Sequence, residues 1–371
     1  MKILDKNLGK SFSPVVQIMP FVTALTFSNL AIAGSDIHEN HRGHHHHDAV
    51  ELSGLLSSHQ HQAGEWMFGV SYEQREFSGN YYGSTQINSE VLSAAGFSMY
   101  ASAMRMDMAM LHIMYAVSNK VTLVLMPHYM KMDMDMMPLA DTMHGSMHNA
   151  TASMTNSMMA HSAHGSMHNM SVSGWSDTVL GATVRLWDEA ELLIQANLNI
   201  SAPTGSVQQK QGNGQFMPYG MQLGTGTWDA LPGITVRQNI GTRLLMGGRL
   251  STRLPLESKN ESGFSVGEIY TVESWIGCSL KEAVALSVRL TYEKQHRISG
   301  HYNGPHNHAS PTDFQRNYGG EFLDFGLGIH VNPRISALRL GLEWIVPLSE
   351  HYNGFQLGRD QGVSANVSWA W

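Results

Sequence analysis

Apolar and polar side chains alternate along this chain with a period of two, from about residue 64 to its end. In the first such segment the apolar positions are Trp66, Phe68, Val70 and Tyr72. This alternation gives a β-strand one apolar and one polar face. Twelve segments follow the pattern, and they are 65–76, 102–117, 121–136, 174–187, 191–203, 228–240, 243–254, 267–279, 283–297, 319–331, 335–347 and 361–371. The pattern therefore predicts an all-β fold.

The connections between these segments are alternately short and long. The short ones are 118–120, 188–190, 241–242, 280–282 and 332–334. The long ones are 77–101, 137–173, 204–227, 255–266, 298–318 and 348–360. Outer-membrane barrels have short periplasmic turns and longer external loops. We therefore predict a transmembrane antiparallel up-and-down β-barrel of about 12 strands in bacterial outer-membrane lipid, with both barrel ends periplasmic.

The last strand ends the chain on an aromatic residue. Its apolar face consists of Val363, Ala365, Val367, Trp369 and Trp371. This resembles the C-terminal strand by which outer-membrane barrels are recognised for assembly. We therefore expect Trp369 and Trp371 to engage the barrel-assembly machinery. The alternative is an ordinary last strand that ends on tryptophan by chance.

The first 33 residues have the pattern of a secretory signal peptide. Their basic residues are Lys2, Lys6 and Lys10. A mostly apolar stretch at 15–30 follows, and Ala31-Ile32-Ala33 forms an A-x-A cleavage site. Polar interruptions in the apolar stretch disfavour the alternative, a membrane anchor. We expect residues 34–63 to form a His-rich periplasmic tail and residues 64–371 to form the barrel.

Composition narrows the class of protein further. The formal charge of −7 provides no basic surface, so we expect no nucleic-acid partner. A single cysteine, Cys278, excludes a disulfide framework and a cysteine-based zinc site. No Ser/His/Asp arrangement indicates catalysis, so we expect no enzyme, with an outer-membrane hydrolase as a minor alternative. The 25 Met and 21 His are clustered, which makes them the candidate chemistry.

Two stretches resemble a known family. Residues 201–206 read SAPTGS, and residues 221–236 read MQLGTGTWDALPGITV. Together they resemble the outer-membrane transporter family named for the MetA pathway of phenol degradation. The resemblance extends loosely from Gly64 to Trp371. It implies a barrel and the passage of small molecules, and it supplies no catalytic residues.

Two further segments are dense in imidazole and thioether side chains. Soft thioethers favour Cu(I) or Ag(I), and imidazole accepts either copper state. The candidate ligands in the tail are His44, His45, His46 and His47. The loop 137–173 contains the hexapeptide HGSMHN twice, and its candidate ligands are His144, Met147, His148, His161, His164, Met167 and His168. The alternatives are a solvated tail and a loop expanded without a ligand, and we expect no required cofactor.

Two neighbouring segments carry Met or His at every second position, within 104–114 and 126–136. The short turn between them sets a register that opposes His112 to Met126 and Met110 to His128 on the lumen face. We predict that these four residues form the best metal site of the lumen. The alternative is that methionine packs the interior as a flexible filler. Charged residues of the opposite parity are expected at or above the lipid headgroups, and they are Arg105, Asp107, Lys131, Asp133 and Asp135.

Other strands place charges of both signs at lumen positions. The predicted lumen-lining residues are Arg249, Arg289, Glu293, Asp324, Arg339 and Glu343. Their mixed signs favour salt bridges over a selectivity filter. Together these features predict a porin-like outer-membrane transporter for small solutes, which handles copper or silver through its Met/His-rich loop and lumen. The alternative is an outer-membrane protein that sequesters metal without transport.

Overall fold

The computed structural model describes residues 62–139, 168–189, 191–281, 283–333 and 337–371. The chain divides into two compact units, residues 1–47 and 48–371, and every described residue belongs to the second. The predicted signal peptide and nearly all of the predicted tail therefore lie outside the described residues. Among those residues, no helix has the length and apolar character needed to cross a bilayer.

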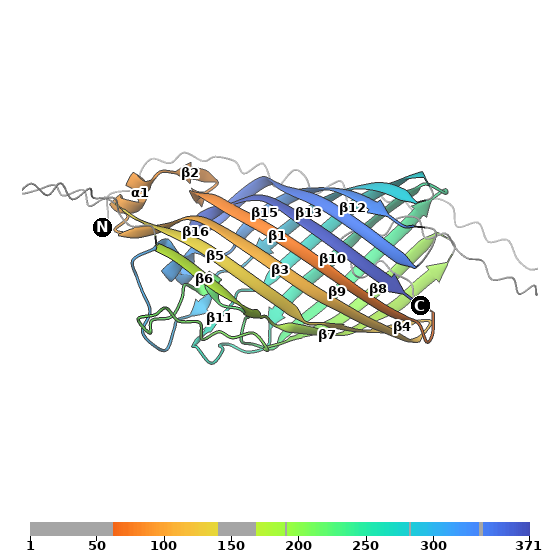
Figure 1. Ribbon diagram of the computed structural model, residues 1–371, viewed down its shortest axis with the longest axis horizontal. Coiled ribbons are helices and arrows are strands. Elements are labelled where there is room, and N and C mark those ends of the chain that lie inside the picture. The colour runs from red at the N-terminus through yellow and green to blue at the C-terminus, as the bar shows by residue number, and fades with distance from the viewer. Residues whose placement is uncertain (1–61, 140–167, 190, 282, 334–336) are drawn as a thin grey trace, which may run out of the picture. The chain divides into compact units, whose positions relative to one another are not determined.

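An antiparallel β-sheet closes on itself to form a barrel (Figure 1). The wall consists of β1 (Trp66–Gly83), β3 (Met99–Ser118), β4 (Val121–Met126), β5 (His128–Pro138), β6 (His168–Trp175), β7 (Thr178–Glu189), β8 (Leu192–Ala202), β9 (Asp229–Ile240), β10 (Leu244–Pro255), β12 (Ile269–Lys281), β13 (Val284–Gln295), β15 (Gly320–Val331) and β16 (Leu338–Ala370). The ring closes because β1 pairs with β16 on one side and with β3 on the other. The predicted all-β barrel is therefore confirmed.

Two of the wall segments are interrupted. β4 and β5 pair in succession with β3 and are separated by Pro127, which has no N–H to donate to a ladder. Opposite them, β6 pairs with β5 and β7 pairs with β4. β4 and β5 thus form one segment of the wall, and β6 and β7 form the next. The ring of the described residues then has eleven segments when β16 is counted once.

β16 supplies two neighbouring segments. Its first part pairs with β15 and its last part with β1, and both pairings end at Tyr352. Since strand directions alternate around the ring, the chain must reverse there, and Gly354 adopts a φ of +80°. The described wall therefore contains twelve antiparallel segments, which agrees with the predicted number.

The predicted long connection at 348–360 is wrong, because β16 is strand throughout this range. β1 and β3 likewise extend beyond the predicted segments, to 18 and 20 residues. The predicted loop 137–173 is shorter than expected, since β5 continues to Pro138 and β6 begins at His168. Exposed polar side chains occur in these extensions, among them Ser78, Asn169 and Asp360, so the apolar outer face that reveals a strand in lipid is missing there.

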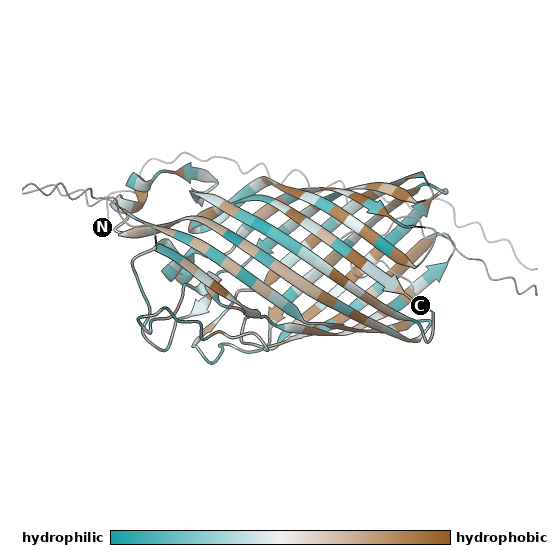
Figure 2. Ribbon diagram, in the orientation of Figure 1, coloured by the Kyte–Doolittle hydropathy of each residue, from teal (hydrophilic) through white to brown (hydrophobic). Residues whose placement is uncertain are grey.

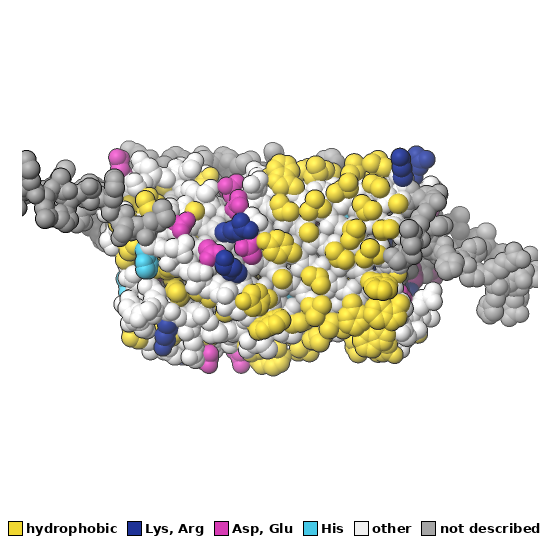
Figure 3. Space-filling model, viewed as in Figure 1, with side chains coloured by type: hydrophobic (Ala, Val, Ile, Leu, Met, Phe, Trp, Pro, Cys, Tyr) yellow, Lys and Arg dark blue, Asp and Glu magenta, His cyan; other side chains and the backbone are white. Residues whose placement is uncertain are grey.

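An apolar belt surrounds one half of the barrel, toward the end where the C-terminus lies (Figure 3). Hydrophobic and hydrophilic residues alternate along the strands, as the colour bands in Figure 2 show. Exposed members of the belt include Leu111, Leu123, Leu125, Tyr129, Leu198, Ile234, Leu250, Ile276, Leu327, Leu342 and Trp344. Large apolar side chains in such a continuous outer band face lipid.

Loops gather at the opposite end of the barrel. They contain β2 (Thr85–Ile87), α1 (Ser89–Ala94), η4 (Tyr219–Met221), β11 (Phe264–Ser265), β14 (Ser299–Gly300), η5 (Pro311–Asp313) and η6 (Gln315–Asn317). An aromatic core joins three of these loops, since Tyr302 stacks on Tyr219 at 4.2 Å and lies edge-on to Phe264 at 5.1 Å between ring centroids. These loops therefore pack as a unit above the lumen.

Candidate functional site

Thioether and imidazole side chains cover one wall of the lumen. The register pairs Met110 with His128, and the next rungs along β3 and β5 pair methionine with methionine. This register is the one predicted from the sequence. The residues of this methionine wall are Met104, Met106, Met108, Met110, His112, Met114, Met126, His128, Met130, Met132, Met134, Met136 and Met170.

The methionine wall faces the interior. Met132, Met134 and Met136 are each 2% exposed, whereas Leu123 and Leu125 on the other parity are 46% and 42% exposed. A further strand extends the wall, because Met134 pairs with Met170 on β6. Thioethers therefore lie side by side across three strands.

Two histidines of this wall are anchored by hydrogen bonds on one ring nitrogen. His128 Nδ1 lies 2.7 Å from the backbone carbonyl oxygen of Asp177. His112 Nε2 lies 2.7 Å from Ser71 Oγ. The second nitrogen of each ring is buried and has no hydrogen-bond partner among the described residues. Two ring nitrogens are therefore held inside the barrel without a hydrogen bond to another described residue.

Apolar side chains fill the interior beside these histidines. The buried cluster consists of Met67, Met114, Val124, Met126, Val179 and Ala370. Met110 packs against it, and so does Leu231 of β9. Side chains from β1, β3, β4, β7, β9 and β16 therefore meet in the interior at this level.

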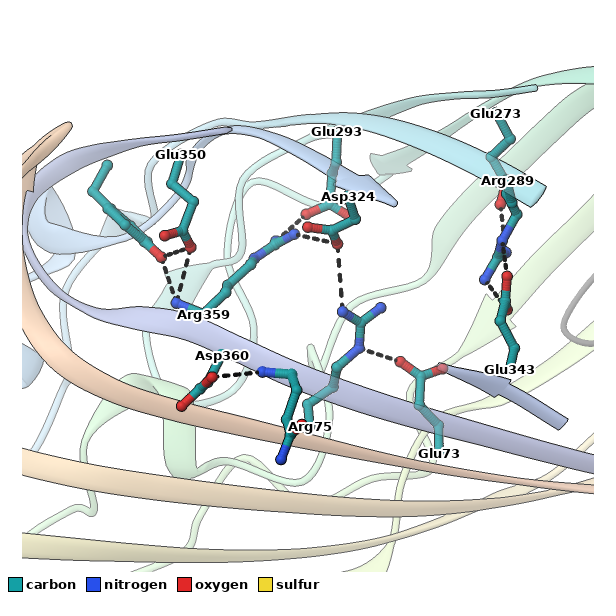
Figure 4. Close-up of polar contacts among 12 residues, drawn as sticks. Glu73, Arg75, Glu273, Arg289, Glu293, Asp324, Glu343, Glu350, Arg359 and Asp360 are labelled. Atoms are coloured by element: carbon teal, nitrogen blue, oxygen red, sulfur yellow. Dashed lines mark hydrogen bonds and ion pairs between the residues drawn. The ribbon is translucent and has the colours of Figure 1, made fainter. Parts of the chain in front are cut away.

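Ion pairs lie on the inner face of the strands next to the methionine wall (Figure 4). Asp324 lies between two guanidinium groups, at 3.4 Å from Arg75 Nη1 and 3.4 Å from Arg359 Nη1. Arg75 also pairs with Glu73 at 2.7 Å, and Arg359 pairs with Glu293. These contacts join β1, β13, β15 and β16 through the interior.

A second network lies further along the barrel. Arg289 pairs with Glu343 and, at 3.1 Å, with Glu273. Arg249 lies 3.7 Å from the same Glu273. Arg339 is half-buried near the start of β16, on the same parity as Glu343. All six predicted lumen-lining residues thus have interior parity, and five of them take part in these two networks.

Sequence reasoning missed three members of the first network, Glu73, Arg75 and Arg359. Glu73 and Arg75 share the parity of the buried Met67, so the alternation within 65–76 was a sufficient signal for them. Arg359 lies in the range that was predicted to be a loop. Its interior position follows only from the extended hairpin of β16.

A cavity of about 360 Å³ lies between the methionine wall and the first network. Met104, Met106 and Met134 line it on one side, and Arg75 and Arg359 on the other. The loops supply further lining from Gly220, Thr312 and Tyr318. Burial raises the pKa of the Tyr318 phenol, which donates a 2.6 Å hydrogen bond to the Thr312 carbonyl, so it stays neutral. One side of the cavity is therefore soft and apolar and the other is charged.

The loop 203–228 folds against the methionine wall. Asp177 holds it, because its carboxylate accepts hydrogen bonds from the backbone N–H of Gly205 at 2.9 Å and of Thr225 at 2.7 Å. A Cβ atom on Gly224 would lie 2.4 Å from Asp177 Oδ1. Met221 and Leu223 are buried against Met132 and Met134 as a result. The stretch that carries the family resemblance is thus the loop that reaches into the barrel.

The other predicted metal ligands are placed differently. His168 is exposed at the start of β6. The remaining ones lie outside the described residues, and they are His44, His45, His46, His47, His144, Met147, His148, His161, His164 and Met167. In the part of the chain that the structure describes, no group of three or more His, Cys, Asp or Glu side chains is arranged to hold a metal ion.

A closed antiparallel sheet with an outer apolar belt defines an integral β-barrel of the bacterial outer membrane. An outer membrane channel from Pseudomonas putida F1 has a similar fold, with a TM-score of 0.55 and 13% identity over 86% of this chain and 100% of that chain. The KdgM porin gives a TM-score of 0.38 at 9% identity, over 81% and 98% of the two chains. A Pseudomonas aeruginosa FadL homologue gives 0.39 at 8% identity, over 82% and 90%. No family model and no curated protein matches the sequence.

Proposed function

We propose that this barrel is a channel-like transporter for small solutes whose Met/His-rich lumen and loop handle copper or silver ions. The observation that carries the proposal is the methionine wall, in which thioethers follow one another along the lumen. Thioether sulfur is a soft ligand suited to Cu(I). It binds without losing a proton, so the thioethers of the wall remain available as ligands at acidic pH. The proposed role involves binding and passage and no catalysis.

The charged side of the cavity supports the passage of hydrated solutes. Arg75, Arg359 and Glu293 face the same space as the methionine wall. A lumen with polar and charged lining is typical of porin-type barrels. A small solute that enters therefore meets fixed charges on one side and soft ligands on the other.

The second candidate is an outer-membrane protein that sequesters metal without transport. The contact of Leu231 with the cluster around Met126 favours it, because side chains occupy the interior at that level. In this case the barrel anchors the Met/His-rich loop and the His-rich tail. The two candidates differ in conductance and share metal binding.

The test combines single-channel current and metal content on the same purified full-length sample. Recordings in planar bilayers use nitrate salts, with and without silver nitrate, so that chloride does not precipitate the ion. We expect open-channel currents that change in amplitude or dwell time with silver, together with bound silver in the sample. Bound silver without any current would support sequestration instead.

A matched variant links the result to the methionine wall. Leucine replaces Met106, Met108, Met130 and Met132, which keeps the side-chain volume and removes the sulfur. The variant should still conduct, and silver should perturb its current less than it perturbs the wild-type current. An equal effect of silver on both proteins would contradict a role for the wall.

A further inference from the structure

Two imidazole nitrogens lie inside the barrel with no hydrogen-bond partner in the described chain. They are Nδ1 of His112 and Nε2 of His128, and both atoms are buried. His112 is 5% exposed. Buried polar atoms in folded proteins are nearly always paired, so each unpaired one calls for an explanation.

The tautomer of His128 is fixed by the backbone. Its Nδ1 lies 2.7 Å from the Asp177 carbonyl oxygen, and a carbonyl only accepts hydrogen bonds. Nδ1 therefore carries the proton, and Nε2 of the neutral ring carries a free lone pair. Histidines that bind metal ions almost always donate their other N–H to a carbonyl, a carboxylate or water in this way.

His112 is held in a comparable manner by Ser71. The hydroxyl group can accept a hydrogen bond from Nε2, which leaves the lone pair on Nδ1. An ion at Nδ1 would select this tautomer. Both rings are thus fixed at one nitrogen and open at the other.

Two thioethers lie beside these nitrogens. Met110 pairs directly with His128. The flanking pair Ile113–Leu125 places Met126 opposite His112. Directly opposed Cβ atoms are about 4.5–5.5 Å apart, and diagonal neighbours about 7–8 Å. The four side chains therefore share one patch of the inner surface that is small enough for a single ion.

We infer that Met110, His112, Met126 and His128 bind one soft monovalent ion, Cu(I) or Ag(I), inside the barrel. The inference rests on the proposed function and deepens it, because it names the ion class and the ligands. Thioethers select a soft ion over Zn²⁺ or Ca²⁺. The apolar neighbours Met67, Met114 and Leu231 favour a single charge, since burying a larger charge costs more. We refer to these four residues as the imidazole–thioether site.

Two nearby carboxylates do not change this assignment. The carboxylate of Asp177, whose backbone carbonyl holds His128, accepts hydrogen bonds from the N–H groups of Gly205 and Thr225. Glu73 lies one rung away, where it pairs along the sheet with Met108. Its carboxylate is engaged by Arg75 at 2.7 Å. The ion at the imidazole–thioether site is therefore bound by neutral ligands, as a soft monovalent ion allows.

Two substitutions remove the open nitrogens and retain the anchoring hydrogen bonds. His128→Asn keeps an N–H near the position of Nδ1, where it can donate to Asp177. His112→Gln keeps an N–H near the position of Nε2, where it can reach Ser71. The matched control is His330→Gln on β15, which removes a buried imidazole outside the methionine wall and keeps an N–H near the position of Nε2, where it can reach Ser287.

The experiment measures silver binding to the full-length protein by equilibrium dialysis against a competing ligand. We expect each histidine variant to lose the tightest-binding equivalent of silver, while the control retains it. Ser71→Ala should weaken that equivalent by about 10–100-fold, the usual effect of losing the partner of a metal-bound histidine. Silver-soaked crystals should give an anomalous peak between Met110 Sδ and His128 Nε2.

Two results would overturn the site: unchanged affinity and stoichiometry in both histidine variants, or no anomalous peak between these residues. The proposed function fails separately. A barrel that passes no current but shows the peak and loses one equivalent in His128→Asn has the site without the transport. A barrel whose current responds to silver equally in wild type and in both variants has the transport without the site.

Discussion

The backbone carbonyl of Asp177 accepts a 2.7 Å hydrogen bond from Nδ1 of His128. The side chain of the same Asp177 accepts hydrogen bonds from Gly205 and Thr225, which lie near the two ends of the loop 203–228. One residue at the break between β6 and β7 therefore orients an imidazole and fastens a loop. The two tasks use different atoms, so they can be separated by substitution.

Asp177→Asn is expected to release the loop and to leave the imidazole in place. Asparagine puts an N–H₂ group where one carboxylate oxygen accepts from Thr225, so a buried donor loses its partner. Such a loss costs about 1–3 kcal/mol. Limited proteolysis of the folded protein should cut within 203–228 faster than in wild type, with silver binding retained. Asp133→Asn, at a partly exposed position on β5, is the control, and equal cleavage of both variants would contradict the role of Asp177 in holding the loop.

Gly224→Ala tests the same contact between Asp177 and the loop 203–228 by changing the loop instead of the carboxylate. A Cβ atom there would lie 2.4 Å from Asp177 Oδ1, so the loop or the carboxylate must move. Gly212→Ala in the same loop is the control, because nothing lies within 4 Å of its added Cβ. We expect faster proteolysis of the loop only in Gly224→Ala. Equal rates of cleavage in the two variants would show that the loop accommodates the added Cβ atom beside Asp177 without being released.

Arg289→Met should destabilise the barrel strongly. The Arg289 and Glu343 side chains are 13% and 3% exposed, and the substitution leaves the buried carboxylate without its cation. Breaking a buried pair in this way costs about 3–5 kcal/mol. Lys131→Met breaks the exposed pair with Asp133 and should cost about 1 kcal/mol or less. The temperature at which heat-modifiable migration is lost measures the difference, and similar temperatures for both variants would refute it.

The orientation of the barrel predicts which turns are reached from outside the cell. In a Cys278→Ser background, a cysteine at Asn213 lies in the loop 203–228, and one at Asn119 lies in a short turn near the C-terminal end. An impermeant maleimide on intact cells should label the first and not the second. Labelling of Asn119→Cys from outside would reverse the topology.

Removal of Trp371 should impair assembly. Its backbone exchanges two 2.9 Å hydrogen bonds with Trp66, and its ring stacks on Phe68 at 5.1 Å between centroids. We propose that Trp369 and Trp371 also present the strand recognised by the assembly machinery. The deletion should lower the amount of heat-modifiable barrel in the membrane. Trp175→Ala, which removes a 64% exposed tryptophan elsewhere on the outer surface, should not.

The wall of the barrel and its inner face could be predicted because each depends on neighbours in sequence. A short turn fixes the register of Met110 against His128, and parity then places every other side chain inward. The anchors of the two histidines could not be predicted, since Ser71 and Asp177 are brought to them by strand pairing across long connections. The Arg75–Asp324 pair joins residues 249 positions apart, and no local pattern encodes such a contact.

The extended strands give the barrel two zones at different depths. On the rungs of Met106 and Met132 the outward neighbours are charged, with Arg105 and Lys131 side chains 51% and 52% exposed. On the rungs of His112 and His128 they are Leu111, Leu125 and Tyr129. The charged cavity therefore lies level with or above the lipid headgroups. The two imidazoles lie deeper, within the hydrocarbon core of the bilayer. Substitutions in the charged cavity can therefore change which solute it accepts without disturbing insertion of the barrel into the membrane. Substitutions at the two imidazoles act at a depth where the solute must lose its water.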